Sequence, residues 1–286
     1  ASSLLLYSQT DNFLIAAMMN PLAVGACSFF TSINEMAINL IPTRLFENVV
    51  QPVIYATPRE QAAEKLPRYF TFLVNISMVA QWPIIMMSLV YHREIIELAF
   101  GGKFIEYSLL MPVVLAFAWS DNVPSLPVTM LALHAENASL ILKSQLFGLY
   151  QIVAMLALIP LLGLFGAAIA TGTLHLFRNL WVWWKMRHTA RWLNFGAAVR
   201  NGLAIWGGAA LLCFLLKTVV PAPPLAQIAF GLVVCGAGVL LFLRSGAIAQ
   251  SDREILGNLM HGRESVLLQR LGLAPNPVTA GAGANP

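Results

Sequence analysis

The residues with the most chemical potential lie between Leu4 and Tyr55, where polar and charged side chains interrupt two apolar segments. They are Asp11, Asn12, Glu35, Asn39, Arg44, Glu47 and Asn48. An ionisable group at the centre of a bilayer costs about 2.5–3.5 kcal/mol on insertion scales, so such groups face a protein interior or a watery cavity. If these segments cross a membrane, their charges therefore mark a functional path.

Three kinds of role are open to these side chains. Asp11 and Glu35 could load a proton or Na⁺, or could pair with Arg44, because a buried carboxylate needs a counter-charge or a partner. Arg44 presents a fixed fork of donors that suits a phosphate group. Asn39 and Asn48 either bind the same ligand as Arg44 or join helices through hydrogen bonds, as polar residues inside membranes do.

Motifs of known enzymes are missing from the sequence. It holds no Gly-rich phosphate loop, no HExxH, no CxxC and no Gly-x-Ser-x-Gly motif. His134 and Glu136 are two residues apart, which places them on different faces of a helix. Cys27, Cys213 and Cys235 lie in apolar segments without metal-ligand spacing and are expected to be small core or lipid-facing residues. We expect no enzyme activity, no metal site and no cofactor beyond a coupling ion, H⁺ or Na⁺.

The composition predicts an all-α, polytopic membrane helix bundle. Of the 286 residues, 58% are hydrophobic and only 10% are charged. A soluble domain carries roughly 25% charged residues, so too few are present here to cover a water-exposed surface. The net charge of +4 could suggest nucleic acid, but the basic residues sit in the breaks between apolar runs and form no basic stripe. We therefore expect membrane lipids, and no nucleic acid, as partners.

We predict about eight transmembrane helices, since each apolar run approaches or exceeds the ~20 residues that one span requires. Their approximate ranges are Ser3–Met19, Leu22–Tyr55 with a bend at Pro42, Tyr69–Tyr91, Tyr107–Leu133, Ala138–Pro160, Gly163–Trp184, Asn201–Val219 and Leu225–Leu243. The first six form a lobe over residues 1–191, and two additional helices occupy 192–244. Residues 245–286 form a cytoplasmic tail with a short amphipathic helix and a disordered end.

The distribution of basic residues sets the orientation. When alternate connectors are assigned to opposite sides, fourteen of the seventeen Lys and Arg fall on one side and only Arg93, Lys103 and Lys217 on the other. Cytoplasmic connectors carry the excess of Lys and Arg. Both ends of this chain are therefore expected to be cytoplasmic.

Three segments resemble motifs of one known family. Glu94–Phe104, with the sequence EIIELAFGGKF, is similar to the connector of polysaccharide biosynthesis proteins that has the pattern ii-l-fG-y. Gly163–Thr171 resembles the entry to the family's next helix, and Ser8–Ile15 with Val24-Gly25 resembles the start of its second lobe. Ala26-Cys27 depart from this pattern, where the family often has Tyr. The resemblance covers about Leu4 to Arg187.

These are the oligosaccharide-lipid flippases of the multidrug/oligosaccharidyl-lipid/polysaccharide exporter superfamily. The resemblance implies that this chain is the second lobe plus two extra helices, with the N-terminal lobe of the same protein as a missing partner. It implies alternating access, with an isoprenoid-pyrophosphate-linked oligosaccharide as cargo, in a bacterial inner membrane. Alternatives are a peptidoglycan lipid-precursor flippase, a drug/cation antiporter, a non-transporting membrane scaffold of a glycan-export complex, or a membrane transferase.

Overall fold

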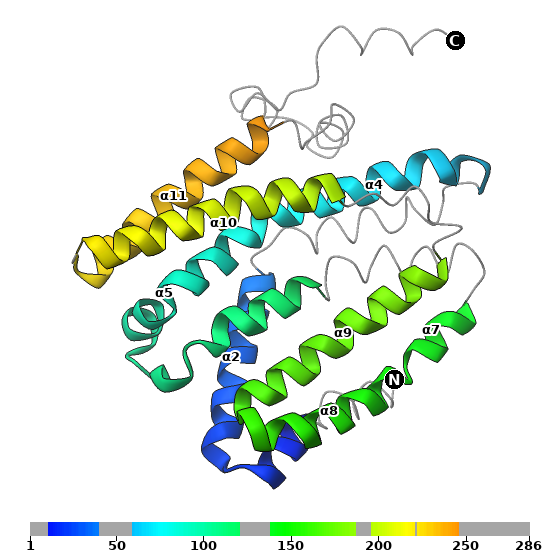
Figure 1. Ribbon diagram of the computed structural model, residues 1–286, viewed down its shortest axis with the longest axis horizontal. Helices are drawn as coiled ribbons and strands as arrows, with labels where there is room; N and C mark the ends of the chain where they lie inside the picture. The colour runs from blue at the N-terminus through cyan, green and yellow to red at the C-terminus, as the bar shows by residue number, and fades with distance from the viewer. Residues whose placement is uncertain (1–10, 40–58, 121–137, 187–195, 221, 246–286) are drawn as a thin grey trace, which may run out of the picture.

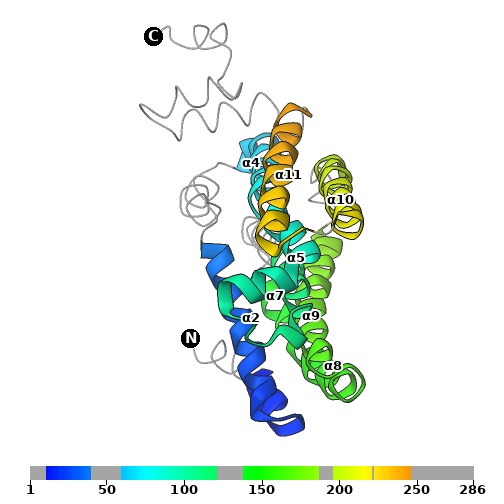
Figure 2. The same ribbon diagram turned by 90° about the vertical axis from the view of Figure 1, so that its left-hand side faces the viewer.

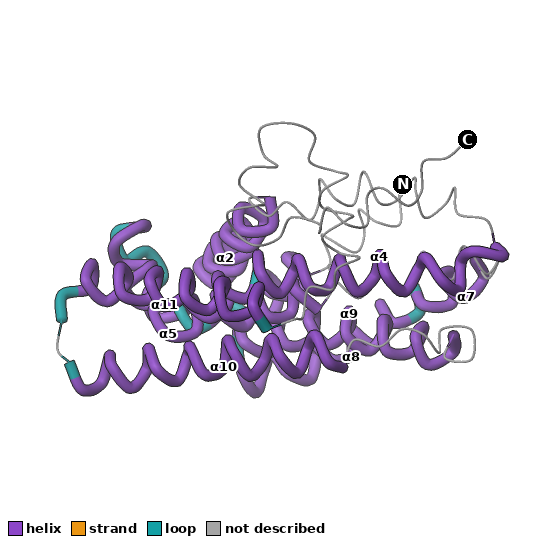
Figure 3. Tube along the Cα trace, turned by 90° about the horizontal axis from the view of Figure 1, so that it is seen from above, coloured by secondary structure: helices purple, strands orange, loops and turns teal. Residues whose placement is uncertain are grey.

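The computed structural model describes residues 11–39, 59–120, 138–186, 196–220 and 222–245. All regular structure in these ranges is helical (Figure 3). The elements are a helix over 11–18, α2 (Pro21–Asn39), α4 (Arg59–Ala80), α5 (Trp82–Phe100), the short 3₁₀ helix η1 (Ile105–Tyr107), a helix over Leu110–Ser120, α7 (Ala138–Ser144), α8 (Phe147–Leu162), α9 (Leu164–Met186), α10 (Gly196–Val219) and α11 (Pro224–Arg244).

Four helices in the described part of the chain are long and apolar enough to cross a membrane. They span Thr71–Phe100, Ser139–Leu162, Val199–Val219 and Pro224–Arg244. Large apolar side chains such as Leu149, Leu212 and Val233 remain exposed on them, which suits contact with lipid tails. The prediction of an all-α membrane bundle is confirmed. The number of eight spans and the domain boundaries stay predictions.

The main core forms where the helix over 11–18, α2, the helix over Leu110–Ser120, α8 and α9 meet (Figure 1). Ile15, Phe30, Leu110, Met155 and Ala170 are buried there. α8 and α9 form an antiparallel hairpin that turns at Gly163. They approach so closely that a Cβ atom at Gly166 would overlap the backbone of Leu158, so only glycine fits.

α10 and α11 pack against α4 and α5, on the side of the molecule away from α8 (Figures 1 and 2). Cys213 of α10 and Cys235 of α11 are buried there beside Met87 and Tyr91 of α5. The prediction of small core residues is confirmed for these two cysteines, and Cys27 is half-buried; all three are free thiols. Small residues at such positions let helix backbones approach in a membrane.

One predicted boundary is wrong. We expected the third span to end at Tyr91 and a connector to run from His92 to Glu106, but α5 continues to Phe100. Tyr91 only kinks the helix (φ −118°, ψ 24°), and the chain first turns away at Gly101 and Gly102, whose φ angles are positive. The predicted fifth span, Ala138–Pro160, agrees closely with the apolar stretch Ser139–Leu162, within which Gln145 and Leu146 form a turn between α7 and α8.

Candidate functional site

Asp11 is the first residue that the structure describes and belongs to the helix over 11–18, where it takes part in a ring of hydrogen bonds with α8 and α9. Gln151 Nε2 of α8 donates to Asp11 Oδ1 at 2.5 Å, and Thr171 Oγ1 of α9 donates to Asp11 Oδ2 at 3.0 Å. Gln151 Nε2 also donates to Thr171 Oγ1 at 3.3 Å, which closes the ring. Both carboxylate oxygens are therefore held, and three helices are joined at one polar point.

The residues around this ring add to its polar character. Tyr150 OH and Thr173 Oγ1 lie 3.0 Å apart on the same two helices. His175, one turn after Thr171 on α9, interacts electrostatically with Asp11. Carboxylate and hydroxyl oxygens are ligands that hard cations prefer, whereas Gln151 turns its Nε2 donor toward Asp11; a carboxylate can also take up a proton. The arrangement could therefore hold either a proton or a small hard cation.

Sequence reasoning singled out Asp11 but missed the roles of Gln151 and Thr171. Gln151 is a buried amide in an otherwise apolar stretch of α8, which is a detectable signal. Its partner Asp11 lies 140 residues earlier, and no local pattern indicates that contact.

Glu35 lies on a polar stripe along the exposed face of α2. The stripe consists of Ser28, Thr31, Ser32 and Glu35, spaced so that they share one side of the helix. All four are exposed, and Ser32 Oγ donates to Ser28 O at 2.9 Å. The opposite face of α2 is apolar and buried in the main core, through Ala23, Ala26, Phe30, Ile33 and Ala37.

The other predicted site residues continue along the chain from this stripe. Asn39 is the last residue of α2, and its side chain lies outside the described part. Arg44 and Asn48 lie wholly outside the described residues, so their predicted roles remain predictions. Asp11 and Glu35 belong to different environments, since Asp11 is held by α8 and α9 while Glu35 is exposed on α2.

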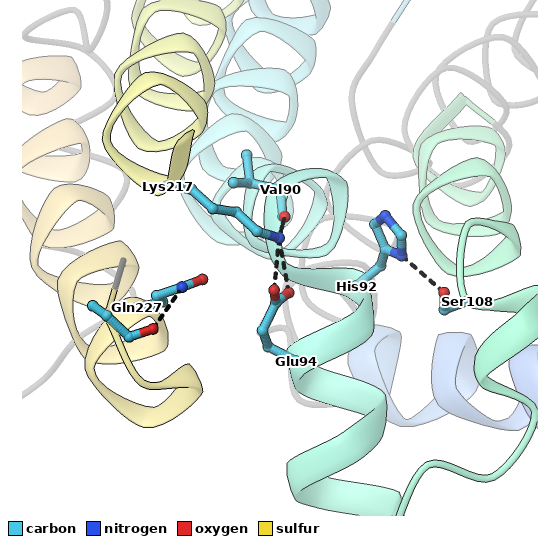
Figure 4. A network of polar contacts seen from close by, with 7 residues as sticks. Val90, His92, Glu94, Ser108, Lys217 and Gln227 are labelled. Carbon is cyan, nitrogen blue, oxygen red and sulfur yellow. Dashed lines mark hydrogen bonds and ion pairs between the residues drawn. The ribbon is translucent and has the colours of Figure 1, made fainter. Parts of the chain in front are cut away.

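A second polar cluster joins α10 to the kink of α5 (Figure 4). Lys217 Nζ lies 2.8 Å from Glu94 Oε1 and donates to Glu94 Oε2 at 2.9 Å and to Val90 O at 2.8 Å. It also lies 5.4 Å from the centre of the Tyr91 ring. Because the helix kinks at Tyr91, the ammonium group supplies a donor to a backbone carbonyl beside the kink. Sequence reasoning used Lys217 only for orientation.

Two further polar contacts lie near this cluster (Figure 4). His92 Nδ1 and Ser108 Oγ are 2.9 Å apart and tie α5 to the turn before the helix over Leu110–Ser120. Gln227 Nε2 donates to Ala222 O at 2.8 Å at the start of α11. In the described ranges, no group of three or more His, Cys, Asp or Glu side chains could hold a metal ion.

Residues 2–109 match the family of polysaccharide biosynthesis proteins. The match includes Asp11, the polar stripe of α2 and all of α4 and α5, whereas Gln151 and Thr171 lie beyond it. Neither the curated proteins nor the solved structures contain a match to the chain. The predicted resemblance to polysaccharide biosynthesis proteins is confirmed over the matched residues.

Proposed function

We propose, from the similarity of residues 2–109 to polysaccharide biosynthesis proteins, that the chain is part of a membrane flippase. Its cargo would be an isoprenoid-pyrophosphate-linked oligosaccharide, moved from the cytoplasmic to the outer leaflet of a bacterial plasma membrane. Alternating access would require a second lobe, because the cargo path of such a transporter lies between two lobes.

The polar stripe of α2 is the structural observation that supports this proposal. Ser28, Thr31, Ser32 and Glu35 are exposed on a helix within an all-α membrane bundle. A carboxylate facing lipid tails at depth is costly, whereas one facing a watery cavity is tolerated. The stripe therefore supports a hydrated path along α2, and the apolar face of α2 attaches that path to the main core.

Arg44 and the asparagines complete the proposed cargo site. Arg44 would bind the pyrophosphate through its fork of donors, and Asn39 and Asn48 would bind sugar hydroxyls. They follow the stripe toward the cytoplasmic end of the predicted second span, where a lipid-pyrophosphate made in the cytoplasm would arrive first.

The ring of Asp11, Gln151 and Thr171 supports coupling to H⁺ or Na⁺. It joins the helix over 11–18 to α8 and α9, so a change of charge on Asp11 would alter the contacts among all three helices. A bound cation can drive transport only if it binds one conformation more tightly than the other. A contact between elements that could separate is a suitable place for such a difference.

The test is glycan export in cells that carry the full-length protein, with the stripe made apolar. We expect Thr31→Leu combined with Glu35→Leu to abolish export while the protein still reaches the membrane. Met36→Leu is the matched control, because Met36 is 62% exposed beside Glu35 but is already apolar.

Export at the wild-type level in the stripe variant would refute a cargo path along α2. Arg44→Ala separates the rival transporters, because an antiporter of cationic drugs should tolerate loss of this positive charge and a pyrophosphate flippase should not. If all of these variants export normally, a non-transporting scaffold fits better.

A further inference from the structure

A small cavity lies where α2, the start of α5 and the helix over Leu110–Ser120 meet. Its volume is about 10 Å³. It is lined by Asn34 and Ala37 of α2, by Gln81, Ile84 and Ile85, and by Leu115, Ala118 and Trp119. It lies apart from the ring around Asp11 and from the exposed stripe of α2.

Two amide oxygens in this lining lack a hydrogen-bond donor among the described residues. Gln81 is only 5% exposed, and its Oε1 atom is buried without a partner. Asn34 Oδ1 is also buried without a partner. The Trp119 indole N–H is already used, because it donates to Ser77 Oγ at 3.3 Å. The other lining side chains, being aliphatic, offer no donor.

A buried carbonyl oxygen without a donor is strongly unfavourable, and most of all inside a membrane, where lipid tails offer no hydrogen bonds. A cavity needs roughly 10–15 Å³ to hold one water molecule, and water enters only where polar partners are present. The cavity meets both conditions. We propose that it binds one water molecule, which donates one O–H to Gln81 Oε1 and the other to Asn34 Oδ1.

This water would connect α2 to the junction of α4 and α5, where the long helix that they form lacks one backbone hydrogen bond. Gln81 lies between the two helices, and Pro83 has no N–H to donate to the carbonyl of Val79. A hydrogen bond through water is nearly as favourable as a direct one. The water would therefore join α2 to α5 while it satisfies both amide oxygens.

Hydroxyl-radical labelling of the purified full-length protein tests the proposal, because radicals generated from a bound water oxidise the side chains beside it. Leu115 and Leu110 form a matched pair on one helix, with exposures of 6% and 1%, and only Leu115 lines the cavity. We expect Leu115 to be oxidised several-fold faster than Leu110. Equal rates in the wild-type protein would overturn the proposal.

Substitutions then show whether the amides hold the water. In the double variant Asn34→Leu/Gln81→Leu, we expect oxidation of Leu115 to fall to the rate of Leu110, while oxidation of exposed Met36 stays unchanged. Ala118→Val fills the cavity, leaves both amides in place and should give the same loss, which covers the case of a double variant that does not fold. Undiminished oxidation of Leu115 in either folded variant would contradict the proposal.

Discussion

At the scale of single residues, the contacts of Asp11 decide what its carboxylate can do. Asp11→Asn keeps the size and most of the hydrogen-bonding capacity of the side chain but removes the charge that would load an ion. We expect this variant to reach the membrane normally and to lose export driven by an H⁺ or Na⁺ gradient. Asn12→Ala, at the exposed neighbouring position, is the control and should export normally. Gradient-driven export by Asp11→Asn would rule out the coupling role.

Gln151 has a structural role that can be measured separately. Gln151→Leu removes the donor to Asp11 Oδ1 and leaves that oxygen half-buried with one partner fewer. A hydrogen bond to a charged group contributes about 1.5–3 kcal/mol, so we expect the free energy of unfolding to fall by that amount. Thermal unfolding in detergent measures it. If the same change in an Asp11→Asn background costs equally much, the charge of Asp11 is not what Gln151 stabilises.

The sequence identifies the charged residues that are unfavourable inside a membrane better than it identifies the residues that contact them. Asp11 and Glu35 stand out because charge is rare in apolar segments. Nothing local distinguishes a carboxylate held by two other helices from one exposed on a helix face. That difference arises from contacts across more than a hundred residues, such as Asp11 with Thr171, which only the packing of α8 and α9 creates.

At the scale of helices, Lys217 holds α10 to the kink of α5. The side chains of Lys217 and Glu94 are 25% and 14% exposed, so Lys217→Met leaves a largely buried carboxylate without its cation. Breaking a fully buried pair costs about 3–5 kcal/mol, and partial exposure reduces this to roughly 1–3 kcal/mol. We expect that loss in thermal unfolding, with partial recovery when Glu94→Gln is added. No loss would mean that the pair does not secure α10.

The packing of α11 on α10 gives a prediction with a built-in control. A Cβ atom at Gly238 would lie 2.8 Å from the Trp206 ring, whereas one at Gly236 would meet nothing within 4 Å. Gly238→Leu should therefore force the two helices apart and destabilise the protein by about 1–3 kcal/mol, as overpacking does. Gly236→Leu should change stability little. Similar melting temperatures for both variants would contradict this packing.

The presence of a helix is predictable here because the apolar runs are long. The positions of helix ends and kinks depend on individual contacts and capping residues, which the sequence indicates less clearly. α5 continues through the polar residues His92 and Glu94 because His92 contacts Ser108 and Glu94 pairs with Lys217. The sequence does not reveal either contact. It ends at Phe100 and is capped by Gly101, where a left-handed backbone costs glycine little. The turn between α7 and α8 is formed by Gln145 and Leu146, so no proline or glycine there predicts it.

At the scale of the whole molecule, the contacts between turns support one common end for several helices. Met19 lies against Gly163, and the Phe104 ring lies against Gly25. The turns after the helix over 11–18, after α5 and between α8 and α9 therefore gather at the same end of the bundle. The charge count predicts that this end, which carries Arg93, Lys103 and Lys217, faces the outer side of the membrane.

Lys103 and Lys185 make that orientation testable. Lys103 is exposed in the turn after α5, and Lys185 is exposed at the far end of α9. α9 is less apolar than the four helices named above, but at 1.5 Å per residue its 23 residues reach about 34 Å, the length that the predicted sixth span requires. With the three cysteines replaced by alanine, we expect Lys103→Cys to react with an impermeant maleimide in intact cells. Lys185→Cys should react only after the membrane is opened. Labelling of both cysteines from the same side would show that α9 does not cross the membrane. Reaction of Lys185→Cys in intact cells, with Lys103→Cys reacting only after the membrane is opened, would contradict the predicted orientation.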